Sequence, residues 1–343
     1  MPLPDHASST LGPLLDIRQV SKRFTKLPNL GERIGALLGA GSTASTVRAV
    51  TDVSLEVRRG EVVGLVGESG CGKSTLGRIV AGIYTPSEGN VLFDGAPVAR
   101  VQGKRTMKLT TRVQMVHQDQ FSSLNPRMRV GDTVGEGPIA HGIVNAAQAP
   151  AYVADMLQRA GLDGSFQARF PHQFSGGQRE RIAIARALAM KPELLVLDEP
   201  VASLDVSIQA QVLNLFMDLR RDLNLTAIFI SHDLGVVRHV SDRVAIMYLG
   251  RLVELAPTAE LYAAPSHPYT KALFESVPRV GAGRQVFKPI AGEIPSALHP
   301  PSGCHFHPRC PHAGPRCRTE VPVLAPVGPG RVAACHLHTG GVG

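Results

Sequence analysis

The chain has 343 residues, of which 43% are hydrophobic, and a net charge of +8 at pH 7. This length suits one large domain or a core with an appendage. No apolar run approaches the ~18 residues that span a bilayer, and the first ten residues lack the basic-then-apolar form of a secretory signal. We therefore expect a soluble chain that does any membrane work through partners. Aromatic residues are only 5% and no dense Lys/Arg run is present, so composition does not favour a nucleic-acid partner.

The first hundred residues predict a β-rich layer. Residues 14–24 alternate between apolar and polar side chains like an edge strand, and residues 27–46 are rich in Gly, Ser and Thr, which is typical of an insertion. Residues 47–61 indicate a pair of strands, and residues 89–98 a hairpin strand. We expect this layer to lie beside the ligand of the next motif.

Residues 62–80 contain a phosphate loop between a strand and a helix. The apolar run VVGLV predicts a buried strand, GESGCGKS matches G-x-x-x-x-G-K-[ST], and TLGRIV begins a helix near Ser74. Glycines let several backbone N–H groups point into one concavity, and the helix adds its positive dipole end, so a polyphosphate is stabilised there. Lys73 is expected to reach the β and γ phosphates, and Ser74 to hold Mg²⁺. The predicted nucleotide contacts are Gly67, Glu68, Ser69, Gly70, Cys71, Gly72, Lys73, Ser74 and Thr75.

The alternative for this stretch is a glycine-rich turn with an incidental lysine. The flanking strand and helix favour nucleotide binding instead, because that context separates a working loop from a chance match. Cys71 is interpreted as a small filler of the loop, since phosphate chemistry needs no thiol.

A helical segment follows, and it ends in a second polar helix start. The chain between about 131 and 170 is rich in Ala, Gln and Leu, and residues 151–162 predict an amphipathic helix. Ser175, with Gly176 and Gly177, is expected to cap a helix that begins near Gln178. Such a cap leaves free N–H groups that attract an anion.

Two apolar strands end in polar side chains. Residues 193–200, ELLVLDEP, predict a parallel strand buried on both faces. Asp198 at its end is well placed to hold Mg²⁺ through water, and Glu199 to orient an attacking water. The alternative, a solvated turn, is disfavoured by the phosphate loop upstream. A second strand ends at Ser231-His232-Asp233, where a histidine by itself is more often structural than functional.

The last quarter of the chain differs in composition. Residues 257–343 are rich in Pro, His and Gly, so we place a domain boundary near 255–285. Cys304, Cys310, Cys317 and Cys335 are separated by five, six and seventeen residues. Four thiolates suit a [4Fe–4S] cluster or a tetrahedral Zn²⁺, although the short C-x₂₋₄-C pair of structural zinc sites is absent. The number of ligands alone does not distinguish iron–sulfur from zinc. A third alternative is that the cysteines bind no metal.

Five motifs in this order resemble those of an ATP-binding cassette (ABC) ATPase: GESGCGKST, FSGGQ at 174–178, LLVLDEP, SLD at 203–205 and SHD at 231–233. FSGGQ is the discriminating motif, because generic phosphate-loop NTPases lack it. The resemblance implies an α/β phosphate-loop (RecA-like) core with an antiparallel β-subdomain, and a helical subdomain at about 119–187, all within an ATPase domain at 14–255. Residues 256–343 then form a cysteine-containing C-terminal extension.

The resemblance also implies roles for single residues. In such proteins two cassettes hold two ATP molecules head to tail, so neither site is complete in one chain. The implied roles are γ-phosphate sensing and a Mg²⁺ contact for Gln118, contact with the opposing ATP for Ser175, Gly176, Gly177 and Gln178, Mg²⁺ association for Asp198, general base for Glu199, dimer contact for Asp205, γ-phosphate switch for His232 and adenine stacking for Phe24.

Further stretches resemble the ATPase subunits of oligopeptide and dipeptide importers: residues 204–216, HPYTKAL at 267–273 and GEIPSALHPPSGCHFHPRCPHA at 292–313. This resemblance implies ATP-driven peptide import at the cytoplasmic face of the inner membrane. The implied partners are a second, homologous ATPase subunit, two transmembrane permeases and an extracytoplasmic solute-binding protein. Relatives with this tail pattern are thought to carry iron–sulfur clusters. The alternatives are a non-peptide cargo such as nickel or glycosides, an exporter, or a soluble ABC ATPase that acts on DNA or ribosomes.

Overall fold

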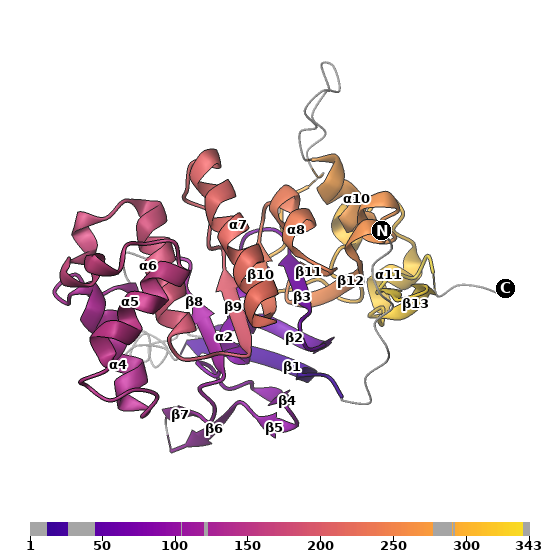
Figure 1. The fold of residues 1–343 in the computed structure, drawn as a ribbon. Coiled ribbons are helices and arrows are strands. Elements are labelled where there is room, and N and C mark those ends of the chain that lie inside the picture. Colours follow the sequence, from indigo (N-terminus) through magenta and orange to yellow (C-terminus); the bar gives the residue numbers. More distant parts are fainter. Residues whose placement is uncertain are drawn as a thin grey trace, which may run out of the picture.

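The computed structural model describes residues 12–26, 45–103, 105–119, 123–276, 290 and 292–338. Most of the predicted insertion at 27–46 lies outside these residues. A long sheet with helices forms the centre of the molecule, an antiparallel sheet lies below it in Figure 1, a helical lobe lies at the left and the C-terminal region at the right.

The central sheet is mostly parallel, and its inner strands are completely buried. Its order is β13-β14-β12-β11-β3-β10-β9-β8, with β8, β9, β10, β3 and β11 parallel. The parallel strands are β8 (Val113–Val116), β9 (Leu194–Asp198), β10 (Thr226–Ser231), β3 (Val62–Val66) and β11 (Arg243–Tyr248). Every residue of β3, β9 and β10 is buried, which confirms the prediction of strands buried on both faces.

Helices on both faces of this sheet complete two hydrophobic cores. Alternate residues of β9 point to opposite faces: Leu195 and Leu197 belong to one core, Leu194 and Val196 to the other. The first core includes residues of α7 (Val206–Leu223) and α8 (Leu234–Val240), and the second those of α2 (Lys73–Val80). Each of these buried strands ends where the sequence becomes polar. The phosphate loop follows β3, Glu199 follows β9 and His232 follows β10.

The antiparallel sheet corrects two predictions. It has the order β2-β1-β4-β5, with β1 (Leu15–Lys26), β2 (Ser45–Val57), β4 (Glu88–Phe93) and β5 (Ala96–Pro97). The edge-strand prediction for 14–24 was wrong, because β1 pairs on both sides; its polar side chains mark an open face of the sheet, not an edge. The strand pair predicted at 47–61 is the single strand β2. Its polar Thr51-Asp52 step forms an irregularity in the pairing with β1, with Asp52 at φ +52°, and not a turn.

The helical lobe contains the predicted amphipathic helix. It consists of α4 (Val130–Ala140), α5 (Ala149–Arg159), α6 (Gly176–Leu188) and two 3-10 helices, Gly164–Ala168 and Pro171–Gln173. A small hairpin, β6 (Ala99–Gln102) and β7 (Arg105–Lys108), precedes β8. The bounds of the helical subdomain at 119–187 stay a prediction.

The C-terminal region packs onto the central sheet. It begins at the end of β12 (Arg251–Pro257), which pairs with β11, and its elements are α9 (Thr258–Ala263), α10 (Pro268–Glu275), a 3-10 helix His307–Arg309, α11 (Pro315–Thr319), β13 (Ala325–Gly328) and β14 (Arg331–Ala333). Strand β14 pairs with β12, so the tail extends the sheet of the core.

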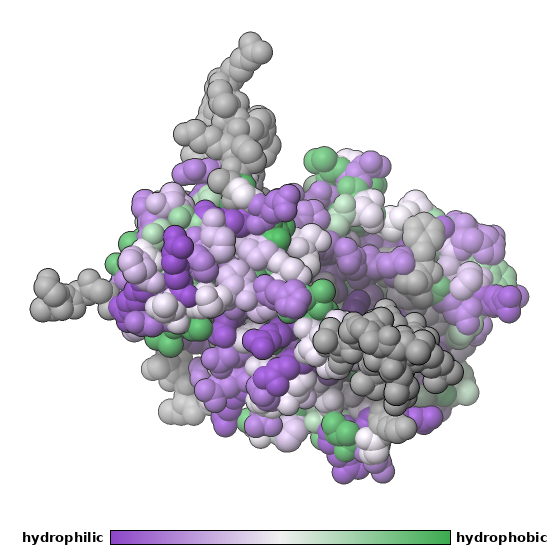
Figure 2. Space-filling model, turned by 180° about the vertical axis from the view of Figure 1, so that it is seen from behind, coloured by the Kyte–Doolittle hydropathy of each residue, from purple (hydrophilic) through white to green (hydrophobic). Residues whose placement is uncertain are grey.

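Two surface properties of the described residues bear on partners. No helix among them is both long enough and apolar enough to cross a bilayer. On the face shown in Figure 2, apolar groups are scattered among hydrophilic side chains.

Candidate nucleotide site

The phosphate loop lies between β3 and α2, as predicted. Gly67, Glu68, Ser69, Gly70, Cys71 and Gly72 form the loop, and Lys73, Ser74 and Thr75 form the first turn of α2. Gly70 has a φ of +76°, and a Cβ built on it meets no atom within 4 Å, so this position borders open space. Gly72 has a φ of +104°, and its Cβ would lie 2.1 Å from the carbonyl oxygen of Ala49. Gly70 is therefore favoured by its backbone conformation alone, and Gly72 also by the close packing of the loop against β2.

Lys73 points back into the loop. Its side chain is buried, and Nζ donates hydrogen bonds to the carbonyl oxygens of Gly67 at 2.7 Å and Glu68 at 3.1 Å. Cys71 is also buried, and burial raises the pKa of its thiol. A protonated, buried thiol agrees with the interpretation of Cys71 as a filler of the loop.

Ser74 and Asp198 form a polar pair beneath the loop. The Ser74 hydroxyl donates to Asp198 Oδ1 at 2.8 Å, and Asp198 is fully buried at the end of β9. Burial raises the pKa of the Asp198 carboxyl. Among the described residues, the buried Oδ2 atom of Asp198 has no hydrogen-bond partner. A hydroxyl and an unsatisfied carboxylate oxygen side by side are the donor set of a Mg²⁺ site, so these residues fit that ion.

Three side chains from distant parts of the sequence meet at Glu199. Gln118 Nε2 donates to Glu199 Oε2 at 2.7 Å, and His232 Nδ1 lies 3.4 Å from Glu199 Oε1. Their positions follow β8, β9 and β10, which are neighbours in the sheet, so the carboxyl ends of three adjacent parallel strands bring them together. Glu199 has a φ of +50°, a conformation that costs energy for a residue with a side chain and that clusters at functional sites.

Comparisons with known proteins agree with this geometry. A family model described as "ABC transporter" matches residues 50–202, and one described as "Oligopeptide/dipeptide transporter, C-terminal region" matches residues 253–317. The oligopeptide transport ATP-binding protein AppF of Bacillus subtilis is 45% identical over 330 residues, which cover 95% of this chain and 98% of AppF. The chain belongs to the oligopeptide/dipeptide family of ABC transporter ATP-binding proteins.

Other similar proteins support the same assignment. A putative peptide import ATP-binding protein of Brucella abortus is 51% identical over 295 residues, which cover 85% of this chain and 87% of that protein. The solved structure of cbiO1 from Clostridium perfringens, part of an ABC transporter complex, has a TM-score of 0.57 at 28% identity and covers 74% of this chain and 91% of its own. The cassette MJ0796, solved as a dimer bound to ADP and phosphate, has a TM-score of 0.59 at 26% identity, covering 71% and 98%. This chain is therefore an ABC ATPase with the cassette fold.

The FSGGQ segment of this ABC ATPase lies in the helical lobe. Helix α6 begins at Gly176, two residues earlier than predicted, with Ser175 as its N-cap. The Ser175 hydroxyl accepts from the Gln178 N–H at 3.3 Å, and the Gln178 side chain accepts from the Ser175 N–H at 3.0 Å, a capping box. A Cβ on Gly177 would lie 2.3 Å from Ile208 Cγ2, so a larger residue here would have to displace the Ile208 side chain of α7.

The described residues show no hydrogen bond between this segment and the phosphate loop of the same chain. Asp205, the predicted dimer-contact residue, is exposed immediately before α7, and its carbonyl oxygen accepts from the Gln209 N–H at 2.8 Å. The structure thus brings together Ser74, Asp198, Glu199, Gln118 and His232, and it places the FSGGQ segment apart in the helical lobe.

Phe24, the predicted adenine-stacking residue, lies near the end of β1 and is 39% exposed. Its ring meets the Tyr84 ring edge-on, with centroids 5.6 Å apart, and Lys22 Nζ lies 5.3 Å from the Phe24 centroid. Sequence reasoning missed Tyr84. An aromatic residue just after the phosphate-loop helix was the available signal.

The four tail cysteines are free and line one small cavity of about 10 Å³ together with His307, His312 and His336. Burial raises the pKa of Cys304 to about 11, and it raises the pKa of Cys310 and Cys335 as well. Among the described residues, no group of three or more His, Cys, Asp or Glu side chains has the arrangement of a metal site. The predicted four cysteines therefore meet at one place, without metal-binding geometry.

Proposed function

We propose that this ABC ATPase powers the import of di- or oligopeptides by hydrolysing ATP between two facing cassettes. The observation that carries the hydrolytic part is the cluster around Glu199, in which residues 81 positions apart in the chain share a hydrogen bond. The peptide cargo is inferred from the names of the relatives and from the match of the tail to a peptide-transporter family model. Cargo specificity then belongs to an extracytoplasmic solute-binding protein.

Glu199 is the proposed general base. A carboxylate that accepts from Gln118 and faces His232 is held in one orientation, and an oriented carboxylate positions a water better than a mobile one. The 57% exposure of His232 leaves its ring accessible to a terminal phosphate. Phosphoryl transfer depends mainly on positioning and on charge stabilisation, which is what this cluster supplies.

Ser74, Asp198 and Gln118 are the proposed residues that hold Mg²⁺. The unsatisfied Oδ2 of Asp198 and the Ser74 hydroxyl supply oxygen atoms of the required kind. When bound, the ion contributes charge stabilisation to the phosphates. Lys73 is the proposed partner of the β and γ phosphates, and it must then exchange its two loop carbonyl partners for phosphate oxygens.

A second cassette is proposed to complete each site. Ser175 and the first N–H groups of the 13-residue helix α6 form an anion-binding end that lies apart from the phosphate loop of its own chain. A facing subunit, proposed to be a homologue of this chain, brings such an end to the ATP held here. The similar cassette MJ0796 forms a dimer, which supports this arrangement.

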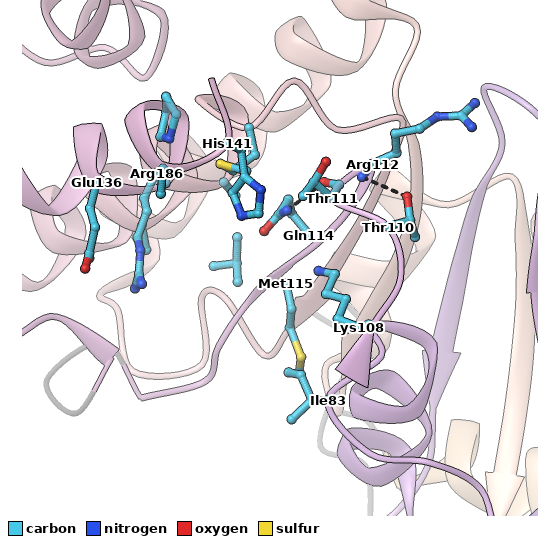
Figure 3. Close-up of a pocket in the computed structure, with 18 of the residues that line it drawn as sticks. Ile83, Lys108, Thr110, Thr111, Arg112, Gln114, Met115, Glu136, His141 and Arg186 are labelled. Carbon is cyan, nitrogen blue, oxygen red and sulfur yellow. Dashed lines mark hydrogen bonds between the residues drawn. The ribbon is translucent and has the colours of Figure 1, made fainter. Parts of the chain in front are cut away.

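Two transmembrane permeases are the proposed membrane partners, and they would hold the ATPase at the cytoplasmic face of the inner membrane. A groove of about 820 Å³ separates β8 from the helical lobe and is the proposed docking place. In Figure 3, Met115 and Ile83 lie on one side of it, and Glu136 and Arg186 on the helical side. The groove is lined by β8, which leads directly to Gln118, and by the helical lobe. A movement of the helical lobe at the nucleotide would therefore change the shape of the groove.

The tail cysteines are proposed to hold a [4Fe–4S] cluster, with Zn²⁺ as the alternative, and their side chains would have to rearrange to do so, because the described residues do not have the geometry of a metal site. Four cysteines on one cavity supply the donor set that both metals use. The cluster would mainly tie the tail together, because a metal bound only by the folded chain stabilises it. Iron and zinc analysis of an anaerobic preparation distinguishes the two: about four irons per chain supports the cluster, and one zinc without iron contradicts it.

Uptake of labelled peptides tests the import function. In cells whose only copy of this chain carries Glu199→Gln, we expect uptake of labelled oligopeptides to stop, whereas the exposed Glu260→Gln in α9 serves as the matched control and leaves uptake intact. Loss of glycoside or nickel uptake with normal peptide uptake would replace the peptide cargo by another solute. Copurification of two permeases with the tagged chain tests the membrane partners.

A further inference from the structure

The C-terminal tail reaches the phosphate loop through one arginine. Arg309 donates from Nη1 to Glu68 Oε2 at 2.8 Å and from Nη2 to Glu68 Oε1 at 3.1 Å, across 241 positions of sequence. The arginine side chain is only 4% exposed and the glutamate side chain 19%. A buried bidentate pair of this kind is directional, and it loses much more when one partner is removed than an exposed pair does.

Glu68 is held by its backbone as well. Its N–H donates to the Tyr269 hydroxyl at 3.0 Å, and its carbonyl oxygen accepts from Lys73 Nζ. Tyr269 is fully buried in α10, so its hydroxyl is a fixed point. Glu68 thus contacts Arg309, Tyr269 and Lys73. Of these, Arg309 and Tyr269 lie outside the phosphate loop and its helix, in the part of the chain that follows the proposed ATPase domain.

The tail fixes Arg309 before any ligand arrives. The residue ends the 3-10 turn His307–Arg309, which follows the buried ring of Phe306, and that ring packs 5.3 Å from Tyr248 and 5.4 Å from Tyr269. Arg309 Nη1 also lies 3.4 Å from the Tyr248 hydroxyl. A guanidinium preorganised by packing loses little further entropy when it orients a partner.

The charge of Glu68 gives this pair a consequence for the nucleotide. Glu68 is the first residue after Gly67 in the loop proposed to cradle a triphosphate, and a bare carboxylate there repels that anion. A guanidinium that covers both carboxylate oxygens neutralises the repulsion, and it also prevents the side chain from turning towards the cradle.

We infer that Arg309 is a positioning residue of the ATPase reaction: by orienting and neutralising Glu68, it keeps the phosphate loop in the form that binds ATP. The inference rests on the proposed phosphate-binding role of the loop, and it is independent of the transported solute. It assigns the tail a part in nucleotide affinity in addition to its packing.

ATP affinity of the full-length chain, measured by calorimetric titration and as KM for hydrolysis, tests this assignment. Arg309→Ala should raise Kd and KM for ATP about tenfold, with a smaller change in kcat, because a charged hydrogen-bond pair is lost. Arg309→Lys keeps the positive charge but not the bidentate guanidinium, so its ATP affinity should lie between those of the native chain and Arg309→Ala. The matched control is Arg316→Ala, which removes another tail arginine that pairs with a glutamate, Glu320, on the surface; ATP affinity should not change.

A second-site variant shows whether Arg309 acts through Glu68. Glu68→Gln removes the repelling charge, so the double variant Arg309→Ala/Glu68→Gln should bind ATP nearly as tightly as the native chain. An Arg309→Ala chain with a lowered melting temperature but native ATP affinity would overturn the inference, because the pair would then only anchor the tail. A tenfold loss that Glu68→Gln does not relieve would also overturn it. If Arg309→Ala fails to fold, ATP affinity is compared between Arg309→Lys and Arg309→Lys/Glu68→Gln instead. Relief of the loss by Glu68→Gln supports the inference, and a loss that stays unchanged overturns it.

Discussion

The cluster at the strand ends and the contact between the tail and the phosphate loop differ in how they are held. Glu199 and His232 are 14% and 57% exposed, and their contacts are single hydrogen-bond or ion-pair distances between polar side chains. Phe306 and Arg309 are 1% and 8% exposed as whole residues and are enclosed by aromatic rings. Polar side chains with few contacts change partners when a ligand arrives, whereas packed aromatic side chains do not. Substitutions in the first region should therefore reduce turnover without loss of stability, and those in the second should reduce stability first.

The largest expected effect is that of Glu199→Gln on turnover. Loss of the proposed general base should lower kcat by about 10³-fold, within the range for such groups, while ATP still binds. The melting temperature should not fall, because glutamine keeps the shape of the side chain and its amide oxygen still accepts from Gln118. Phosphate release and nucleotide titration measure the two quantities. Native turnover would remove Glu199 from this role and would make the cluster merely structural.

Phe306→Ala should have the converse effect in the second region. Removal of a fully buried aromatic side chain costs about 3–5 kcal/mol of unfolding free energy. Denaturant unfolding of the full chain measures this loss, and the smaller Phe306→Leu change should recover part of it because most of the volume is kept. If Phe306→Ala left the unfolding midpoint unchanged, the tail would not be packed on the core as described, and the comparison between the two regions would fail.

The first region was predictable from the sequence, and the second was only partly so. Asp198, Glu199 and His232 lie within two residues of the end of an apolar run, and such runs predict parallel strands whose carboxyl ends meet at one edge. Gly-rich loop chemistry located Lys73 and Ser74 in the same way. The places of these residues need only local sequence, because each is positioned by its own strand or loop, but the roles of His232 and Gln118 were predicted only from the family resemblance.

The contacts of the tail depend on long-range packing that no local pattern encodes. Phe306 and Arg309 stand in a segment without helix or strand periodicity, and their partners Tyr248 and Glu68 lie far away in sequence. The same limit explains the error at β1: alternation reports one exposed face of a sheet, but it does not tell whether a second strand pairs at the other side. Tyr84 was missed because its place beside Phe24 is a long-range contact between the segment that follows α2 and strand β1.

Ser175 sharpens the comparison because it combines a structural contact with a proposed site contact. Aspartate caps a helix about as well as serine, so Ser175→Asp should leave the melting temperature within a few degrees of the native value. The added carboxylate would face the ATP of the partner and repel its phosphates. ATP-dependent dimerisation of the Glu199→Gln chain should therefore weaken by roughly tenfold or more. Size-exclusion chromatography with ATP measures dimerisation. The neutral Ser175→Asn, also a good cap, separates charge from shape, and equal dimerisation of both variants would place α6 away from the partner's ATP.

The smallest expected effect is that of Phe24→Ala, and it asks whether the antiparallel sheet belongs with the catalytic cluster or with the packed tail. Stacking of a base on an aromatic ring contributes about 1–3 kcal/mol, so ATP affinity should fall about tenfold, and Phe24→Trp should restore it. Inorganic tripolyphosphate, which has no base, should compete for the site equally well in native and Phe24→Ala chains, because the phosphate loop is unchanged. Stability should change little, because the ring is 39% exposed. Equal losses of ATP and tripolyphosphate affinity would mean that Phe24 supports the loop by packing against Tyr84 and does not contact adenine.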